Sequence, residues 1–322
     1  MCTGVRRRTG GDRTVKVLVA GGGAFGKEHL RALLDMGVEL AVAESRADEL
    51  ERLGALFPVA DRDQDAGRLI QRFAPDGIVI ATPAVAHAPL AIMALERNIP
   101  VLVEKPVAPD SAIMQQLCEA ASCSRAFLQP GHILRFSAPH RKLHEIVQEG
   151  QIGDLLRIVS RRYRDSSHAE RYRDVDPVFT TMVHDIDLAL WFDGSDAVDV
   201  SARRLPANDF RSLTATEIGS LRGAQWHLSL AWLHPSLDCP PDRVELVGTR
   251  GSVEFEAGRG IDLYTAEGHH QLPLASDDDP LRVELEAFLS GIRSGRLVAP
   301  VTPEDALRGL LIAERIVRMV NP

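Results

Sequence analysis

Short apolar segments alternate with segments of helical periodicity through the first half of the chain. Residues 15–20 form an apolar run rich in β-branched side chains, typical of a strand buried on both faces of a parallel sheet. Leu30, Leu33 and Leu34 then recur at helical spacing, and Gly37 ends that pattern. This alternation predicts a doubly wound parallel sheet in an α/β fold. Further strands are predicted at residues 38–43, 77–83, 100–103 and 126–129, and helices at residues 47–56, 65–73, 87–95 and 112–121.

The second half of the chain has a different pattern. Its strand-like runs are short and separated by turn signals such as GTRG at residues 248–251, which predicts a mostly antiparallel sheet. His269 and His270 fall in a polar stretch that we expect to be a solvated turn. The predicted strands span residues 155–163, 197–204, 224–233, 243–247, 253–257 and 261–265, and the predicted helices span residues 141–149, 180–192, 281–292 and 302–320.

A glycine turn joins the first predicted strand to the first predicted helix. Gly21, Gly23 and Gly26 have G-x-G-x-x-G spacing, in which the first glycine allows a sharp turn and the second a close approach of a pyrophosphate. The third allows close packing of the helix on the strand. Ala24 and Phe25 lie between them, at the helix N-terminus that would face the anion. The surrounding strand, helix and acid favour a dinucleotide site over a glycine-rich turn in another α/β fold.

The acid after the second predicted strand indicates which dinucleotide binds. Glu44 stands where a carboxylate accepts hydrogen bonds from the adenosine ribose, and it would repel a 2′-phosphate. Ser45 and Arg46 follow it and are able to hold that phosphate, so they are also candidate cofactor contacts. We expect NAD rather than NADP.

Further candidate side chains follow the next two predicted strands. Thr82 and Pro83 end one of them, with His87 shortly after, and Glu104 and Lys105 end the other. Because ligands of such folds bind beyond the carboxyl ends of the strands, we expect all five beside the cofactor. Lys105 is suited to binding a substrate hydroxyl and stabilising a developing alkoxide. The alternative is a solvated surface lysine.

A second chemical element lies in the predicted helix at residues 180–192. Thr180, His184 and Asp187 share one face of it, because they are spaced at i−4, i and i+3. His184 is suited to general-base catalysis near neutral pH, and Asp187 would fix its tautomer or raise its basicity. The alternative is a purely structural histidine. The spacing of His184 and its neighbouring acids does not converge on one ion, so we expect no metal.

Basic residues supply the remaining candidates. Residues 161–174 contain five arginines, and Arg161 and Tyr163 are expected to contact the substrate. A basic segment in an acidic protein suits an anionic substrate such as a nucleotide sugar, unless it is a solvated loop. His132 and Arg135 lie in GHILRF at residues 131–136. Arg135 would contact the cofactor or a substrate phosphate, or alternatively form a salt bridge between the domains.

Composition narrows the possible partners. The 322 residues carry a net charge of −8, with a pI of about 5.8, which does not indicate binding to nucleic acid or to an anionic membrane. Four cysteines without C-x-x-C or metal-site spacing, no secretory segment and no membrane-spanning apolar run indicate a cytoplasmic protein. Residues 1–13, rich in arginine and glycine, are expected to form a disordered lead-in.

Together these motifs resemble those of the Gfo/Idh/MocA oxidoreductases. The resemblance rests on the glycine turn, ATP at residues 81–83 before a histidine, VLVEKP at residues 101–106, RF at residues 135–136 and HDID at residues 184–187. It covers essentially the whole chain. It implies a Rossmann domain at residues 14–131 and a second domain at residues 132–301 with a large, open, mostly antiparallel sheet. It also implies that the helix at residues 302–320 packs back on the first domain, and that the exposed sheet joins a homodimer or homotetramer.

The resemblance also implies roles for particular residues. The family lysine of E-K-P lies at the reactive carbon of the nicotinamide, which makes Lys105 catalytic. The family pattern D-x-x-x-H-x-x-D matches at His184, the catalytic histidine, and at Asp187, but Thr180 replaces the first acid. The substrate is expected to contact Lys105, His132, Arg135, Arg161, Tyr163, Thr180, His184 and Asp187.

The G-H-x-x-R-F pattern resembles the branch of the family that oxidises UDP-N-acetylhexosamine derivatives. The expected reaction is therefore NAD-dependent oxidation of UDP-N-acetylglucosamine at C3, giving the 3-keto sugar nucleotide that an aminotransferase uses. One alternative is a dehydrogenase of a free sugar, an inositol or another polyol. Others are a glycoside hydrolase that uses NAD transiently and a non-catalytic sensor that binds dinucleotide.

Overall fold

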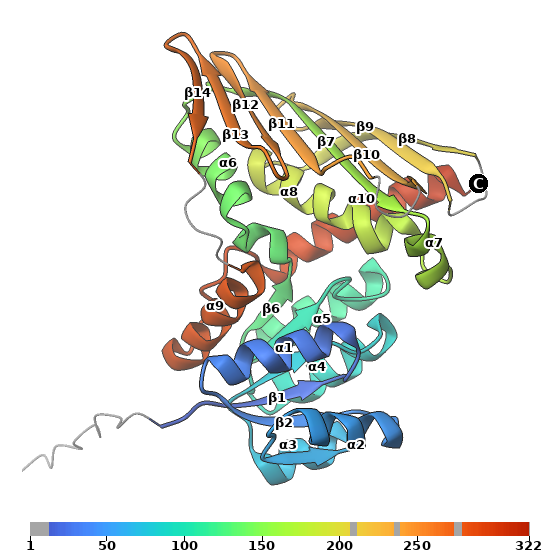
Figure 1. The fold of residues 1–322 in the computed structure, drawn as a ribbon, viewed down its shortest axis with the longest axis vertical. Helices are drawn as coiled ribbons and strands as arrows, with labels where there is room; N and C mark the ends of the chain where they lie inside the picture. Colours follow the sequence, from blue (N-terminus) through green and yellow to red (C-terminus); the bar gives the residue numbers. More distant parts are fainter. Residues whose placement is uncertain (1–12, 207–210, 235–238, 274–278, 322) are drawn as a thin grey trace, which may run out of the picture.

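Two β-sheets at opposite ends of the molecule are joined by a layer of helices (Figure 1). The computed structural model describes residues 13–206, 211–234, 239–273 and 279–321. Residues 1–12, which make up nearly all of the expected disordered lead-in, lie outside the described residues. The six-stranded sheet lies at the lower end in Figure 1 and the eight-stranded sheet at the upper end. This arrangement confirms the predicted fold class.

The first sheet is entirely parallel, in the order β3-β2-β1-β4-β5-β6. Ala20 at the end of β1 lies opposite Ala43 of β2 and Ile80 of β4, so the carboxyl ends of these strands meet at one edge. The short edge strand β3 was not predicted, because it is a polar segment without an apolar pattern. The strands are β1 (Lys16–Ala20), β2 (Glu39–Ala43), β3 (Asp61–Asp63), β4 (Gly77–Ile80), β5 (Val101–Glu104) and β6 (Leu128–Gly131).

Helices cover both faces of this sheet, as a doubly wound fold requires. Two of them are capped by aspartates: Asp65 and Asp110 each accept a hydrogen bond from a backbone N–H three residues later. The helices are α1 (Ala24–Asp35), α2 (Ala47–Leu56), α3 (Ala66–Phe73), η1 (Ala84–Ala86), α4 (His87–Glu96) and α5 (Ser111–Cys123).

Helix α9 (Pro280–Ser294) belongs to the core of the first sheet, although it comes late in the chain. Leu281, Leu285 and Phe288 pack with Val17 and Val19 of β1, and the helix also contacts α1. The amphipathic segment at residues 281–292 was expected in the second domain. That placement is wrong, since the apolar face of the helix is complementary to the first sheet and not to the second.

The second sheet is antiparallel except where β10 runs parallel to β7, and its order is β14-β13-β12-β11-β7-β10-β9-β8. Two of its strands, β9 and β14, were not predicted. His269 and His270 lie in β14 rather than in a turn, and Nε2 of His269 is 2.6 Å from Oδ1 of Asp262 on the neighbouring strand. The strands are β7 (Leu155–Asp165), β8 (Ala197–Leu205), β9 (Leu213–Ser220), β10 (Gln225–His234), β11 (Arg243–Gly248), β12 (Gly251–Glu256), β13 (Gly260–Thr265) and β14 (Gly268–Leu272).

Helices cover only the face of this sheet that points toward the first sheet (Figure 1). The last helix begins with a capping box, in which Thr302 and Asp305 each accept a hydrogen bond from the other's backbone N–H. Its Leu310 packs in the core of the first sheet and its Ile316 in the core of the second, so the helix joins both. The helical elements are η2 (Ile133–Phe136), α6 (Ala138–Gln148), α7 (Ser167–Arg171), the π-helical turn η3 (Val178–Met182), α8 (Val183–Asp193) and α10 (Pro303–Val320).

Candidate active site

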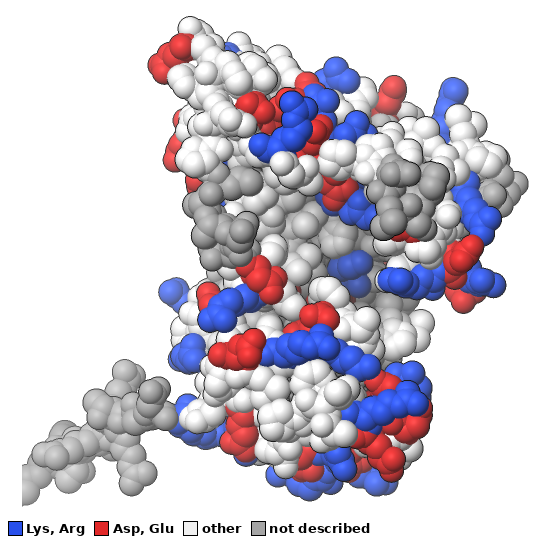
Figure 2. Space-filling model, viewed as in Figure 1, with Lys and Arg blue, Asp and Glu red and all other residues white. Residues whose placement is uncertain are grey.

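A cavity of about 600 Å³ lies between the carboxyl edge of the first sheet and the helical layer of the second. Figure 2 shows the corresponding hollow across the middle of the molecule, with lysine and arginine side chains along it. The cavity is lined by Phe25, Ala81, Thr82, Pro83, Ala84, His87, Glu104, Lys105, Pro106, Ile133, Arg162, Arg164, His168, Tyr172, Val175, Thr180, Thr181 and His184.

The glycine turn has the conformation that the spacing predicts. Gly21 has a φ of +101°, and a Cβ there would lie 2.5 Å from the carbonyl oxygen of Ala81. A Cβ on Gly26 would overlap the carbonyl oxygen of Gly21. A Cβ on Gly23, by contrast, would meet nothing within 4 Å, and this residue begins α1 without a side-chain cap. The turn therefore offers open space and unpaired helix N–H groups, which fit the pyrophosphate of a dinucleotide.

Glu44 is held as an anion at the end of β2. Its carboxylate accepts hydrogen bonds from the backbone N–H of Gly22 at 2.8 Å and from the backbone and side chain of Arg46 at 3.1 Å each. Burial opposes ionisation, but these hydrogen bonds outweigh it and hold the pKa of Glu44 below its usual value. Ser45 lies beside it, with its hydroxyl 3.4 Å from the carboxylate. An ionised acid here fits a ribose diol.

Lys105 reaches from the end of β5 across to the helical layer of the second domain. Its Nζ donates a hydrogen bond to the carbonyl oxygen of Thr180 at 2.9 Å. Burial lowers the pKa of Lys105, the charge of Arg162 lowers it further, and the charge of Glu104 opposes both. The side chain thus lies in the cavity wall and is not a solvated surface group.

The other strand-end residues mainly support this edge of the sheet. The ring nitrogens of His87 are 2.7 Å from the carbonyl oxygen of Thr82 and 3.1 Å from that of Pro106, so His87 ties two strand-end loops together. Burial lowers the pKa of His87, and a neutral ring donates only one of these bonds. Glu104 is buried, and its carboxylate is 2.7 Å from Nε2 of His29 on α1.

His184 lies in the first turn of α8 and faces the cavity from the side opposite the glycine turn. Burial and the nearby charges of Lys105 and Arg162 hold the pKa of His184 well below its usual value. The imidazole is therefore neutral at neutral pH and is able to accept a proton. Thr180, which stands in place of the family acid, presents its carbonyl oxygen to Lys105 and directs its hydroxyl to the carbonyl oxygen of Pro177 at 3.4 Å.

Asp187 does not assist His184 in the way that the helical spacing suggests. Its carboxylate accepts hydrogen bonds from Arg135 at 2.7–3.1 Å, and no hydrogen bond joins it to His184 in the part of the chain that the structure describes. The π-helical turn before α8 and the burial of α8 on several sides direct the two side chains to different neighbours. The expectation that Asp187 fixes the tautomer of His184 is therefore wrong for this structure.

Arg135 forms a salt bridge, but with Asp187 inside the second domain and not between the domains as its alternative interpretation had it. Its guanidinium is buried and also bonds to the carbonyl oxygen of Pro300 at 2.7 Å and to Asp305 at 3.1 Å. These contacts join η2, α8 and the start of α10. His132 is buried nearby, with Nδ1 3.6 Å from Asp187. Neither Arg135 nor His132 is among the residues that line the cavity.

Arg161 and Tyr163 lie on the wrong face of β7 for substrate contact. Tyr163 bonds to Ser229 at 3.0 Å and stacks on His234, and the guanidinium of Arg161 lies over the Tyr163 ring. Side chains alternate between the faces of a strand, so it is Arg162 and Arg164 that face the cavity. Ile158 and Ser160 are buried on that same side. This alternation with a period of two residues is the sequence signal that could have identified which arginines face the cavity.

The cavity arginines are paired with acids. Arg162 bonds to Asp185 at 3.0–3.2 Å and to Asp242 at 2.5 Å, and Arg164 makes two bonds to Asp242 at 2.6 and 2.9 Å. Ser160 also donates a hydrogen bond to Asp185. The positive charge that the sequence concentrates here is therefore largely balanced within the protein.

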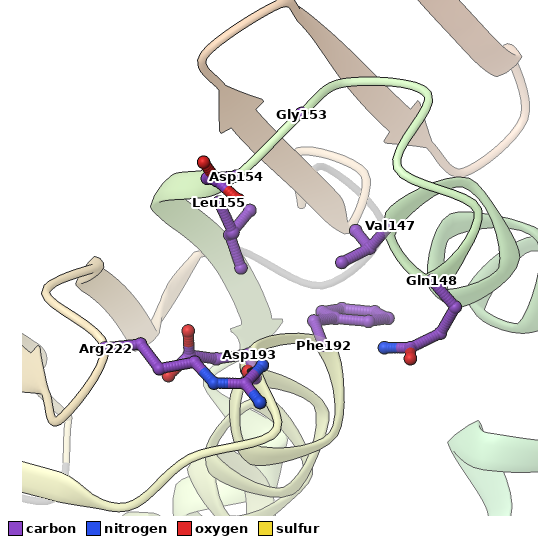
Figure 3. Close-up of a pocket in the computed structure, with 8 residues that line it drawn as sticks. All are labelled: Val147, Gln148, Gly153, Asp154, Leu155, Phe192, Asp193 and Arg222. Atoms are coloured by element: carbon purple, nitrogen blue, oxygen red, sulfur yellow. Dashed lines mark hydrogen bonds between the residues drawn. The ribbon is translucent and has the colours of Figure 1, made fainter.

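A second cavity of about 540 Å³ lies in the second domain (Figure 3). It is bounded by the ends of α6 and α8 and the start of β7, and Nη1 of Arg222 donates to the carbonyl oxygen of Asp193 at 2.9 Å beside it. It contains neither the glycine turn nor a candidate acid–base pair. The lining residues are Val147, Gln148, Gly153, Asp154, Leu155, Phe192, Asp193 and Arg222.

Two kinds of feature are absent from the described residues. No group of three or more His, Cys, Asp and Glu side chains among them is arranged to hold a metal ion. In the same residues, no helix is both long and apolar enough to cross a lipid bilayer.

Family models match both halves of the chain. The model described as the oxidoreductase family with an NAD-binding Rossmann fold matches residues 15–132, and the model of the GFO/IDH/MocA C-terminal domain matches residues 140–254. NAD is thus the cofactor of the first domain.

Individual relatives are similar at lower identity. Inositol 2-dehydrogenase 2 of Saccharopolyspora erythraea is 28% identical over 95% of this chain and 93% of its own length. Inositol 2-dehydrogenase 4 of the same organism is 28% identical over 66% of this chain, and inositol 2-dehydrogenase of Corynebacterium glutamicum is 28% identical over 60%. The chain spans only 64% and 58%, respectively, of the length of these two relatives.

Solved structures share the fold over nearly the whole chain. UDP-N-acetylglucosamine 3-dehydrogenase from Acidithiobacillus ferrooxidans aligns with a TM-score of 0.83 at 21% identity, covering 96% of this chain and 98% of that one. Myo-inositol 2-dehydrogenase from Lactobacillus plantarum aligns with a TM-score of 0.81 at 21% identity, covering 96% and 97%. At these identities the likeness shows the fold alone. With both domains matched by family models, the chain belongs to the Gfo/Idh/MocA family of NAD-binding oxidoreductases.

Proposed function

We propose that this protein is an NAD-dependent dehydrogenase that oxidises a secondary hydroxyl of a cyclic polyol or sugar. The observation that carries the proposal is the meeting of Lys105 and His184 in one cavity, which also reaches Phe25 beside the glycine turn. These side chains come from different domains, and each is brought to the cavity by its own structural element. A sensor that only binds dinucleotide has no need for a neutral base and a buried cation at the same place.

We assign separate tasks to the two side chains. His184, neutral at working pH, accepts the proton of the substrate hydroxyl. Lys105, held by the carbonyl oxygen of Thr180, stabilises the oxygen as negative charge develops on it. NAD, when bound by the glycine turn and Glu44, supplies the hydride acceptor. Glu44 would bind its ribose, and residues at the carboxyl edge of the first sheet would hold its nicotinamide end.

A neutral polyol is the substrate class that the cavity charges favour. Arg162 and Arg164 form hydrogen bonds with Asp185 and Asp242, so their positive charge is largely neutralised and little is left to bind a pyrophosphate. The similarity to inositol 2-dehydrogenases supports the same class.

UDP-N-acetylglucosamine, oxidised at C3 for a later transamination, is the second candidate. A UDP-N-acetylglucosamine 3-dehydrogenase shares the fold over nearly the whole chain, so the fold is compatible with this substrate. The motif that first favoured it gives less support, because Arg135 and His132 are buried outside the cavity.

The test is formation of reduced nicotinamide by purified protein, followed by absorbance. The substrates are myo-inositol, N-acetylglucosamine and UDP-N-acetylglucosamine, and NAD and NADP are compared for each. In one assay with UDP-N-acetylglucosamine, an aminotransferase and an amine donor are added to remove the keto product and so draw the reaction forward. Turnover of the polyol without a nucleotide requirement supports the proposal. Turnover of UDP-N-acetylglucosamine alone would replace it by the second candidate, and NAD binding without turnover of any hydroxyl substrate would contradict both.

A further inference from the structure

A buried acid that has no role in the proposed dehydrogenase reaction lies near Glu104, the residue before the catalytic Lys105. Glu284 on α9 has an exposed fraction of 0%, and neither of its carboxyl oxygens has a hydrogen-bond partner among the described residues. It is tied to β6 through its backbone, because Nε2 of Gln129 donates to its carbonyl oxygen at 3.2 Å. Gly131, two residues further along β6, lies opposite Glu104 of β5. A second carboxyl group is thus placed close to Glu104 in the core.

The two acids are not equivalent. Glu104 accepts hydrogen bonds from Nε2 of His29 at 2.7 Å and from the backbone N–H of Lys105 at 3.2 Å. Glu284 receives none. Because hydrogen bonds stabilise the ionised form and burial penalises it, the negative charge belongs on Glu104. Burial, together with the charge of Glu104, raises the pKa of Glu284 well above its usual value.

The cluster is also short of hydrogen-bond donors. Oε1 of Gln129 and Nδ1 of His29 are buried acceptors without a partner in the described part of the chain, as are both carboxyl oxygens of Glu284. A neutral carboxyl group is a donor, whereas an ionised one adds only acceptors. One proton on Glu284 therefore relieves both the charge repulsion and the donor shortage. The titratable groups around the pair are His29 on α1, His87 at the start of α4, Lys105 after β5 and His132 before η2.

We propose that Glu104 and Glu284 hold one proton between them and that this proton resides on Glu284. Glu104 is then ionised, and it is the positioning partner that keeps Lys105 charged. Lys105 needs such a partner, since it is buried beside the permanent cation of Arg162. Glu284 acts on Lys105 only through Glu104. The role of Lys105 rests on the proposed function, but the ionisation of the acid pair does not.

The first test measures thermal unfolding of wild type and Glu284→Gln between pH 4.5 and pH 8. A group whose proton is held more tightly in the folded state gives stability that is full below its unfolded pKa and is lost as pH rises. Glutamine mimics the neutral acid and never ionises. The variant should therefore match wild type near pH 4.5 and melt higher at pH 8, by roughly 2–4 °C or more.

Glu286→Gln is the matched control, because Glu286 lies on the same helix, is exposed and pairs only with Arg282 among the described residues. It should change the melting temperature at neither pH. A Glu284→Gln protein that melts lower than wild type at pH 8, or identically at both pH values, would overturn the assignment of the proton.

The second test follows Lys105 directly. The chain has only four lysines, so labelling lysine with ¹³C gives four side-chain signals, and Lys105→Met identifies the one of interest. Glu104→Gln should move the titration midpoint of Lys105 down by about one pH unit, while Glu104→Asp, which keeps the charge, and Glu286→Gln should leave it near the wild-type value. An unchanged midpoint in Glu104→Gln would refute the positioning role. Neither test uses substrate, so a failure of the proposed function is distinguished from a failure of this inference.

Discussion

The glycine turn and strand β7 border the same cavity, but they contribute to it in different ways. The turn acts through backbone: Gly21, Gly23 and Gly26 are there because a side chain at each would collide with the chain or fill the space for the cofactor. Strand β7 acts through side chains, and which arginines reach the cavity depends on a period of two residues. A site built from backbone can therefore be predicted from residue spacing. A site built from side chains on a strand can be predicted only if it is also known which face of the strand points to the cavity.

The largest effect is expected at Lys105, which lines the cavity that both regions border. Lys105→Met should lower kcat/KM by about 10²–10⁴-fold, because it removes the cation that stabilises the developing alkoxide. NAD affinity should change little, since the turn is intact. Steady-state kinetics and calorimetric NAD binding measure the two effects. Lys142→Met, on the exposed side of α6 and paired with Glu145, is the control and should behave as wild type.

A smaller effect is expected at the glycine turn itself. Gly23→Ala places a methyl group where no protein atom lies within 4 Å, so the free energy of unfolding should change by less than about 1 kcal/mol. NAD affinity should fall about tenfold or more, because the methyl group enters the space expected for the pyrophosphate. Chemical denaturation and NAD titration provide the measurements. Unchanged NAD affinity would show that the cofactor does not approach this residue.

Because only one face of β7 points to the cavity, substitutions of neighbouring arginines on this strand should affect KM differently. Arg164→Ala should raise the KM for the substrate several-fold and disturb Asp242, whereas Arg161→Ala should leave KM within about twofold, because Arg161 lies on the other face. The comparison uses the same strand and the same substitution. An equal loss in both variants, measured under identical conditions, would mean that the face assignment is wrong.

A separate expected effect concerns acid stability near the buried Arg162. Burial and the charge of Arg162 lower the pKa of His140 to about 3, so the folded state resists protonation that the unfolded state accepts near pH 6.5. Stability is thus lost as pH falls through this window, by about 1.4 kcal/mol per pH unit well below pH 6.5. His140→Asn, which cannot titrate, should lose stability more slowly between pH 6.5 and pH 5 in denaturant titrations. Parallel curves for the two proteins would count against the depressed pKa.

Most of the fold and half of the site follow from local sequence signals. The parallel sheet, the glycine turn and the strand-end positions of Thr82 and Lys105 depend on apolar runs and spacing, which are local properties. Other features depend on which distant surfaces pack together, and no local pattern predicts this. They are the edge strand β3, the placement of α9 and the partner of Asp187. Arg135 illustrates the limit: its sequence context suits a phosphate ligand equally well, and only the tertiary contacts with Asp187 and Asp305 decide its role.

The central claim is that one cavity brings a neutral base from the second domain to the cofactor of the first. It is tested most directly in His184→Asn by measuring NAD affinity and single-turnover formation of reduced nicotinamide on the same preparation, with His269→Asn on the exposed strand β14 as the matched control. The account predicts that His184→Asn binds NAD within about threefold of wild type and reduces it at least about 100-fold more slowly, while the control does neither. Wild-type reduction by His184→Asn would contradict the account.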